Sequence, residues 1–528
     1  LPGDRGSQRP IRVEEEMTAT RIASAATIGF GGVAALALAS GSLLIDPAPT
    51  TVEGSAHSAQ PSQVLLACPS GLVDPFNTAN VASGTTWSSL STTPINPAPA
   101  SVTGTGGTIP TALTLAGQGG GELAGLSAVG CAAPRTSQWF ATGATTSGAD
   151  MVLILSNPGP TASVVSVDGY GGAGPLNAAP RQVTVAAGTS VSVLLAGWFP
   201  DENSLVVHVQ ADGGGIAAWV QASLMNGEIP QGTTLASGVV PATTQTILGV
   251  DPKGTSLLRL MSPSGDANVS VSVADSSGLH PLGGGQTLVA EGSTLEMPLD
   301  GASQDSTPIA LVVTSDREIV AQTTTITLGA PWAQRTNAWV LRSNATPAIP
   351  LTQAALPGRG ALEAMATKVL SSEPIRDTSL ATQSGVSATR ASLLLYAPLT
   401  DARTTSEGEW SDEESTPAPS QTPNIWASPS PAATQAQSGD EGDTQSSGTS
   451  PTTPGAVAVT VAGRTIYVAP GVPTLVDLPE TGGQISAPTP IQAAVVMSAD
   501  TAVGRMMTTW NVGTEGISAA NGSIRVVN

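Results

Sequence analysis

The chain has 528 residues, a formal net charge of −20 and only 11% charged residues, while Gly and Pro together make up nearly a fifth of it. This composition excludes coiled-coil and long-helix proteins, which need Glu, Lys and Leu in quantity, and nucleic-acid binders, which need a basic surface. Only one long apolar run is present, so a polytopic membrane protein is excluded as well.

The N-terminal region predicts export. Residues 22–45 carry no charge and lie between Arg21 and Asp46. As a helix, this run would span about 36 Å, which is enough to cross a bilayer core of roughly 30 Å. The sequence Ala37-Leu38-Ala39 also fits a signal-peptidase site, so a cleaved signal remains open beside an uncleaved anchor.

The distribution of basic residues indicates an orientation. Arg21 directly precedes the run and the next basic residue is Arg135, so the positive-inside rule favours a cytoplasmic N-terminus. We therefore expect a cytoplasmic tail at 1–21, a transmembrane anchor or signal segment at 22–45 and a flexible stalk at 46–62. The protein would be a single-pass cell-membrane protein with an extracellular C-terminal region, or alternatively a secreted one.

The two cysteines, Cys68 and Cys131, both lie in the exported part. An even count of Cys in an oxidising compartment predicts one disulfide, and two unpaired buried thiols are the alternative. Closing a loop of this length would contribute roughly 4 kcal/mol in the chain-entropy model. Neither a His nor a third Cys lies near the pair in sequence, so a metal site is not expected here, and no cofactor is expected elsewhere.

Internal repetition is the strongest signal in the sequence. Three stretches share one order: an apolar run ending at Pro, a Val-Ala-x-Gly motif, a Leu seven residues after that Gly, and an apolar run near an Asp. The Pro, Gly, Leu and Asp of the three copies are Pro158, Gly188, Leu195 and Asp212; Pro263, Gly292, Leu299 and Asp316; and Pro398, Gly471, Leu478 and Asp500. Gly and Asp are 24 residues apart in both the first and the second copy. We align the run 494–497 of the third copy with the run 310–313 of the second.

Each apolar run is short, rich in β-branched residues and bounded by Gly, Pro, Asn or Asp, which predicts strands. The fold class is therefore all-β, with three tandem antiparallel β-sandwich modules after a single N-terminal transmembrane or signal helix. The first module spans 63–240 and includes an N-terminal extension that could add strands to it. The second spans 241–350 and the third 351–528. One short helix is expected at 361–370.

The third module contains an insert at 404–455. It has no Lys or Arg, eight Asp or Glu, and many Ser, Thr, Pro, Gln and Gly residues, so it is predicted to be disordered. Trp410 and Trp426 lie within it. A Trp in a flexible acidic segment can dock into an apolar pocket of a partner, so we take both as candidate partner-binding residues; a plain spacer is the alternative.

The order of the two cysteines, Trp139, the strand sequence 153–159 (LILSNPG) and a later Val-Ala-x-Gly motif resembles an uncharacterised actinobacterial exported family, a domain of unknown function on membrane-anchored proteins. The resemblance covers about 63–510. It implies export and tandem β-sandwich repeats. The family supplies no catalytic residues to carry over, and the acidic insert departs from it.

Other motifs favour structural roles. The sequence 478–482 (LPETG) matches a sortase sorting signal, but 46 residues follow it without an apolar span, so a strand end with its turn is favoured. Gly169 begins a GxGxxG match that no helical pattern follows, which favours a loop over a dinucleotide site. The three histidines, His57, His208 and His280, have no metal-site spacing.

Three functions follow from these observations. The leading hypothesis is a non-enzymatic cell-envelope protein, a β-sandwich scaffold or interaction protein whose partners are envelope proteins or glycans. An envelope carbohydrate-binding protein that uses surface Trp is the alternative, because Trp outnumbers Phe and Tyr together, nine to seven. A glycan hydrolase with two carboxylates in a cleft is less favoured.

Overall fold

The computed structural model describes residues 63–91, 93–105, 109–227, 229–326, 343–377, 386–399 and 455–513. All of them belong to the compact unit Gln60–Ala519. The expected tail, anchor and stalk lie outside the described residues, as do almost all of the acidic insert and both of its Trp residues. None of the helices that the structure describes is long and apolar enough to cross a membrane.

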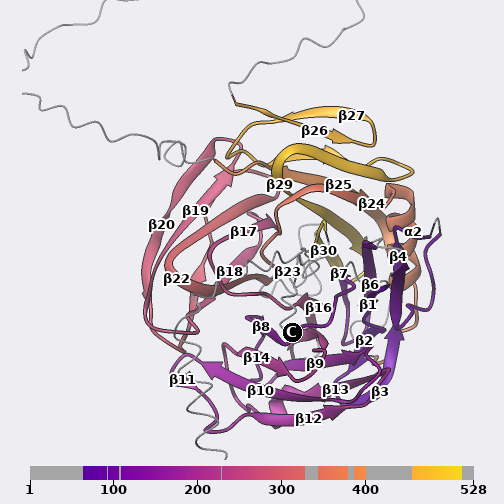
Figure 1. The fold of residues 1–528 in the computed structure, drawn as a ribbon, viewed down its shortest axis with the longest axis vertical. Coiled ribbons are helices and arrows are strands. Elements are labelled where there is room, and N and C mark those ends of the chain that lie inside the picture. The colour runs from indigo at the N-terminus through magenta and orange to yellow at the C-terminus, as the bar shows by residue number, and fades with distance from the viewer. Residues whose placement is uncertain are drawn as a thin grey trace, which may run out of the picture. The chain divides into compact units, whose positions relative to one another are not determined.

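The fold is all-β, as the sequence predicts, and the first module consists of two sheets (Figure 1). Its elements are β8 (Ser137–Phe140), β9 (Ala149–Asn157), β10 (Ser163–Gly171), β11 (Gly174–Pro175), β12 (Arg181–Val185), β13 (Thr189–Leu194), the 3-10 helix η2 (Leu195–Gly197), β14 (Val206–Ala211), β15 (Ala217–Asn226) and β16 (Ile229–Ser237). Val165 and Val207 of one sheet pack against Leu153 and Val220 of the other. The alternation of buried and less buried residues along β10 matches the period of two that the sequence shows.

The second module repeats this plan with one difference. Its strands are β17 (Ala242–Val250), β18 (Thr255–Met261), β19 (Ala267–Asp275), β20 (Gly278–Val289), β21 (Thr294–Pro298), β22 (Ile309–Ile326) and β23 (Ser343–Ala345). The long strand β22 takes the place of both β14 and β15. Its first half pairs with β17 and β19, and its second half pairs with β18 and β23.

The third module has the same plan again and adds the predicted helix. Its elements are β24 (Leu351–Leu356), α2 (Arg359–Leu370), β25 (Val386–Tyr396), β26 (Val457–Val461), β27 (Arg464–Val468), β28 (Thr474–Asp477), β29 (Gly483–Thr501) and β30 (Gly504–Asn511). The strand orders show the equivalence. The first sheets run β12-β10-β14-β8, β20-β19-β22-β17 and β27-β26-β29-β24, and the second sheets run β13-β9-β15-β16, β21-β18-β22-β23 and β28-β25-β29-β30.

The repeated motifs occupy equivalent places in the three modules. Gly188, Gly292 and Gly471 all adopt positive φ, at 67°, 66° and 77°, in the turn before β13, β21 and β28. An L-residue disfavours that region, which explains why Gly recurs there. The Leu seven residues later is buried in its own module core in each copy.

The alignment of the third closing run is wrong. Ala494 pairs with Leu394 of β25 and with Asn511 of β30, so 494–497 belongs to the second sheet, whereas its assumed counterpart 310–313 belongs to the first. The reason is that β29, like β22, passes from one sheet into the other, and the run 494–497 lies after this passage whereas 310–313 lies before it. Apolar periodicity cannot tell which of two buried sheets receives a run.

The N-terminal extension forms sheets of its own and does not add strands to the first module. Its strands are β1 (Gln63–Ala67), β2 (Gly71–Asp74), β3 (Asn77–Ser83), β4 (Thr85–Ser88), β5 (Ser101–Thr105), β6 (Ala112–Gln118) and β7 (Gly125–Gly130). They pair as β1-β5, β2-β3 and β4-β6-β7. Both faces of the sheet β4-β6-β7 are buried, one against the first module and one against the third.

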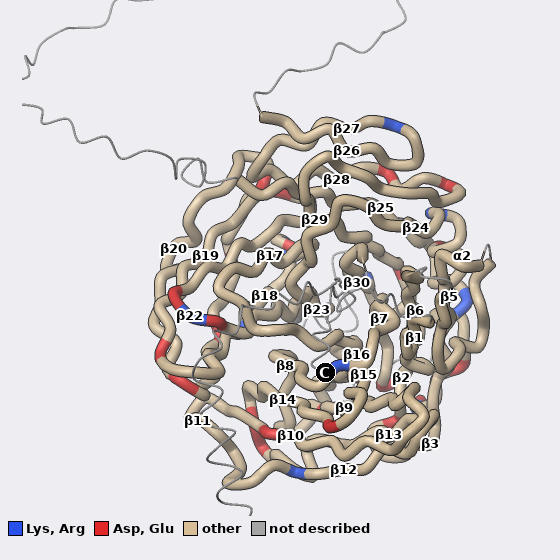
Figure 2. Tube along the Cα trace, viewed as in Figure 1, with Lys and Arg blue, Asp and Glu red and all other residues tan. Residues whose placement is uncertain are grey.

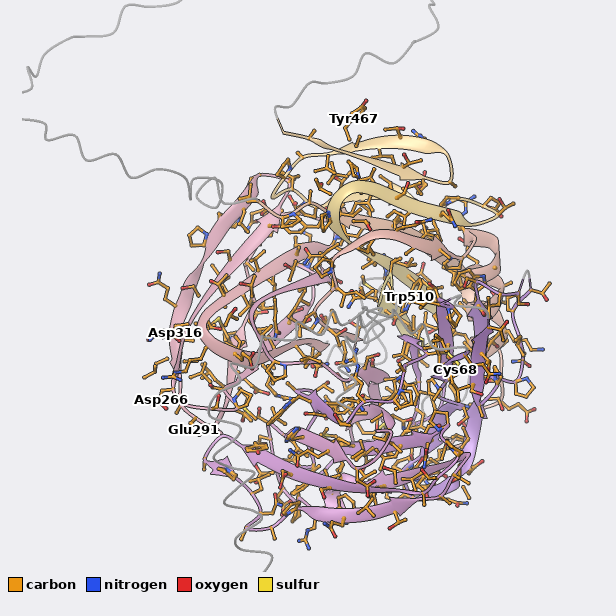
Figure 3. The ribbon with its side chains drawn as sticks, in the orientation of Figure 1. Cys68, Asp266, Glu291, Asp316, Tyr467 and Trp510 are labelled. Atoms are coloured by element: carbon orange, nitrogen blue, oxygen red, sulfur yellow. A yellow bond between two sulfur atoms is a disulfide. The ribbon has the colours of Figure 1, made fainter. Side chains whose placement is uncertain are left out.

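Hydrophobic contacts join these four parts in a closed cycle. Trp139 of the first module packs with Met261 of the second. The second and third modules share a cluster that includes Leu248 and Tyr396. The third module packs its helix and Trp510 against the extension, and the extension packs Leu72 and Val73 against Trp219 of the first module. Figure 3 labels Trp510 of β30 and Cys68 of the extension.

Candidate functional site

The predicted disulfide is present. Cys68 and Cys131 are joined with an S–S distance of 2.01 Å and a Cα–Cα distance of 4.4 Å, and both residues are buried. They follow β1 and β7, and Ala67 at the end of β1 also exchanges backbone hydrogen bonds with Ala132, just beyond β7, at 2.9 and 2.8 Å. The bond therefore fastens the start of the extension to the segment that leads into the first module.

The tryptophans that the structure describes serve packing. Trp87, Trp139, Trp219 and Trp510 are each at most 7% exposed, and Trp198 is partly buried against the first core. The indole N–H of Trp219 donates a hydrogen bond to the carbonyl of Gly130 at 3.2 Å. A row of surface Trp, which the carbohydrate-binding alternative needs, is absent from this part of the chain. Trp410 and Trp426 lie outside the described residues, so their role stays a prediction.

A Ser, a His and an Asp meet on the outer face of β8, β14 and β10. The hydroxyl of Ser137 lies 2.8 Å from Nε2 of His208, and Asp168 is the cross-strand partner of His208. Burial lowers the pKa of His208 to about 4, against an opposing effect of the Asp168 charge. The ring stacks on Trp139 with centroids 3.8 Å apart.

This arrangement differs from a nucleophile–base–acid relay. In such a relay the acid holds the imidazole by a hydrogen bond, whereas the structure records none between Asp168 and His208. The ring of His208 instead stacks on Trp139, which packs with Met261 of the second module. Sequence reasoning missed this grouping because its members come from three separate strands.

A cluster of three carboxylates surrounds Arg376, which follows helix α2. The guanidinium hydrogen-bonds to Glu122 and lies 3.7 Å from Asp74, and its plane covers Phe76 at 4.4 Å. The hydrogen bond that Arg376 donates to the Glu122 carboxylate raises the pKa of Arg376. Burial and the Glu122 charge raise the pKa of the third carboxyl, Asp150 of β9, while Arg376 lowers it.

The Arg376 cluster connects three parts of the chain. Asp74 and Glu122 belong to the extension, Asp150 to the first module and Arg376 to the segment after α2 in the third. The backbone carbonyl of Arg376 also accepts a hydrogen bond from the Glu122 N–H at 3.0 Å. The arrangement is a group of charged side chains that joins the extension to the first and third modules. A carboxyl with a raised pKa beside ionised ones is also what acid–base chemistry uses, so Asp150 is the residue to test for activity.

Two further carboxylates, Asp275 and Asp305, line a hollow of about 410 Å³ in the second module. Burial by itself raises the pKa of Asp275, but hydrogen bonds from Ser277, Ser303 and His280 outweigh it and hold that pKa well below its ordinary value. Asp305 accepts hydrogen bonds from the backbone and hydroxyl of Ser276. Both carboxylates thus order the loops around them, and the lowered pKa of Asp275 is the opposite of what a general acid needs.

The LPETG sequence is a turn held against helix α2. Leu478 is 2% exposed in the third core, and the carbonyl of Pro479 accepts a hydrogen bond from the Arg359 N–H at 2.8 Å. The Arg359 side chain pairs with Glu480 at 2.7 Å. Gly482 closes the turn with a φ of 78°. The segment is part of the folded module, as the repeat position of Leu478 indicates.

Metal ligation has no support in the described region, where no group of three or more His, Cys, Asp or Glu side chains is placed to hold an ion.

Comparison with known proteins identifies a family but no activity. A family profile described as a family of unknown function (DUF5719) matches residues 90–402. This span begins inside the extension, includes the first and second modules, and ends where the acidic insert begins. No curated protein matches the chain.

Proposed function

Because the chain belongs to DUF5719, a family of unknown function, we propose a function from its structure: an exported, non-catalytic scaffold of the cell envelope, tethered through residues 22–45. The observation that carries the proposal is the closed cycle of contacts among the extension and the three modules. Such a cycle makes a stiff platform because no module can move without breaking two interfaces. The disulfide supports export, since such bonds persist in oxidising compartments.

The groups that would otherwise suggest chemistry make structural contacts. His208 stacks on Trp139, Arg376 pairs with Glu122 and Asp74, and Asp275 orders the loops around it. In this proposal the protein catalyses no reaction, and its partners are envelope proteins or glycans that bind its surface. The Trp residues of the acidic insert remain candidates for one such contact.

The location is tested by fractionation and thiol labelling of the full chain expressed in a bacterium. The proposal predicts a membrane fraction, extracellular protease sensitivity, and no labelling of Cys68 or Cys131 after denaturation without reductant. The Cys68→Ala variant is the control, because it frees Cys131 for labelling. A soluble cytoplasmic chain with both thiols reduced would refute the proposal.

The absence of catalysis is tested separately on a panel of envelope glycans. We expect no turnover above that of a heat-denatured sample. Hydrolysis by the wild type that disappears in Asp150→Asn, while Asp305→Asn retains it, would show that the Arg376 cluster is an active site and would overturn this part of the proposal.

A further inference from the structure

Three basic side chains converge on one hollow in this strongly acidic protein. The hollow has a volume of about 530 Å³ and lies between the second and third modules. Lys253 enters it from the turn between β17 and β18, Arg390 from β25 and Arg505 from β30. The whole chain has only 19 Lys and Arg residues, so three around one cavity is a marked local concentration. Figure 2 shows how sparse Lys and Arg are along the rest of the trace.

The hollow arises where two packed sheets diverge. Arg390 lies opposite Ser498, and Ser498 lies opposite Met507, so these residues share the outer face of the second sheet of the third module. Further along the same face, Leu394 and Tyr396 are buried against the second module. The apolar end of the face is therefore covered by the second module, and the cationic end is open. We call the hollow at the open end the wedge.

The cations of this wedge have few partners among the described residues, although Nζ of Lys253 donates a hydrogen bond to the carbonyl of Gln304 at 3.4 Å. The structure records no ion pair within 4.0 Å for Lys253, Arg390 or Arg505 among the described residues. The Nε of Arg505 is buried without a hydrogen-bond partner. Asp500 is the cross-strand partner of Arg505 but makes no such pair. Burial without a partner costs free energy, and an anion in the wedge would recover it.

The remaining acid at the wedge does not neutralise it. Asp251 lies in the lining, and its Oδ1 accepts a hydrogen bond from the backbone N–H of Lys253 at 2.9 Å. Asp251 therefore orders the turn that presents the lysine. The hydroxyls of the lining come from Ser306, Thr307, Ser392 and Ser498, and its apolar surface from Pro308, Leu475, Val496 and Met507.

We propose that this wedge is a binding site for an acidic saccharide. Arginine and lysine would hold the carboxylate, the serine and threonine hydroxyls would bond to the sugar hydroxyls, and Val496 and Met507 would contact the apolar face of the ring. The volume lies within the range of roughly 300–1,000 Å³ that small-molecule sites occupy. The inference goes beyond the scaffold and does not depend on where the protein is located.

The test uses the full chain and calorimetric titration with three probes: trigalacturonic acid, maltotriose and inorganic phosphate. The proposal predicts that trigalacturonic acid binds at least tenfold more tightly than the other two and that its affinity falls as salt is raised. Equal affinity for maltotriose, tighter binding of phosphate, or no binding of trigalacturonic acid would overturn it.

Variants locate the site. Arg390→Gln and Arg505→Gln should each weaken trigalacturonic acid at least tenfold and Lys253→Gln several-fold, with unchanged melting temperatures. Arg181→Gln is the matched control, because Arg181 is an exposed strand residue of the first module outside the wedge, and its affinity should stay within twofold. Unchanged affinity in Arg390→Gln and Lys253→Gln, which are exposed substitutions compatible with folding, would overturn the proposal.

The acidic insert, 404–455, is the anionic segment of the chain to test as an alternative occupant of the wedge. Deletion of residues 404–455 should leave the affinity for trigalacturonic acid within about threefold. If the probe binds only after this deletion, the wedge is occupied by the chain itself and the saccharide proposal fails.

Discussion

Removing the disulfide should destabilise the protein by a large and calculable amount. Cys68 and Cys131 are 63 residues apart, and a loop of this length corresponds to about 4 kcal/mol of unfolding free energy in the chain-entropy model. The change is best made as the double variant Cys68→Ala/Cys131→Ala. Alanine leaves no hydroxyl at two buried positions, where an unpaired polar group would add a cost of its own.

The folded state should survive this change, because its local contacts remain. Ala67 and Ala132 still exchange two backbone hydrogen bonds, and the extension still packs against two modules. Most of the loss should therefore come from the gain in freedom of the unfolded chain. Urea unfolding followed by Trp fluorescence measures it, and the circular dichroism spectrum in water should not change.

Two controls separate the covalent bond from the substituted side chains. The single variant Cys68→Ala should lose as much stability as the double one, and reductant should destabilise the wild type while leaving the double variant unaffected. If the double variant unfolds within about 1 kcal/mol of the wild type, the loop-entropy reasoning is wrong for this protein.

Three further predictions test the repeats and the interfaces. Gly188→Ala should lower stability by roughly 1–2 kcal/mol, since its φ is 67° although its surroundings are open, whereas Gly197→Ala, equally open without a positive φ, should be nearly neutral in the same urea titration; equal effects would contradict a backbone cause. Because burial holds the pKa of His208 near 4, below the unfolded value near 6.5, stability should be complete above pH 6.5 and decline towards pH 4; His208→Gln should flatten this slope, and an unchanged slope would rule the residue out. Trp219→Phe should cost about 1–3 kcal/mol in denaturant titration, because the carbonyl of Gly130 loses its buried donor; no loss would mean that water replaces the indole.

What the sequence predicts well is local. The Gly of the Val-Ala-x-Gly motif is needed for a positive φ, so Gly471 could be placed in a turn despite the long insert before it. The helix was also predictable, because Leu362, Met365, Ala366 and Val369 follow a helical period and bury one face.

What the sequence does not predict depends on contacts between distant residues. The Arg376 cluster joins residues about 250 positions apart, and no local pattern marks either side. The wedge cations are isolated in the sequence and converge only because β25, β30 and a turn of another module meet. The alignment of the run 494–497 of β29 was wrong for a related reason, because this buried run fits both sheets equally well.

The connection between β25 and β26 has a practical consequence. In the first module the equivalent strands, β9 and β10, are joined by only five residues, 158–162, and in the second β18 and β19 are also joined by five, 262–266. The third module accepts sixty at this place, 397–456, and keeps the same sheet orders. Loop length adds to the closure entropy only logarithmically. A foreign peptide or reporter domain could therefore be inserted at either of the two short turns, so the protein can serve as a carrier with two insertion sites.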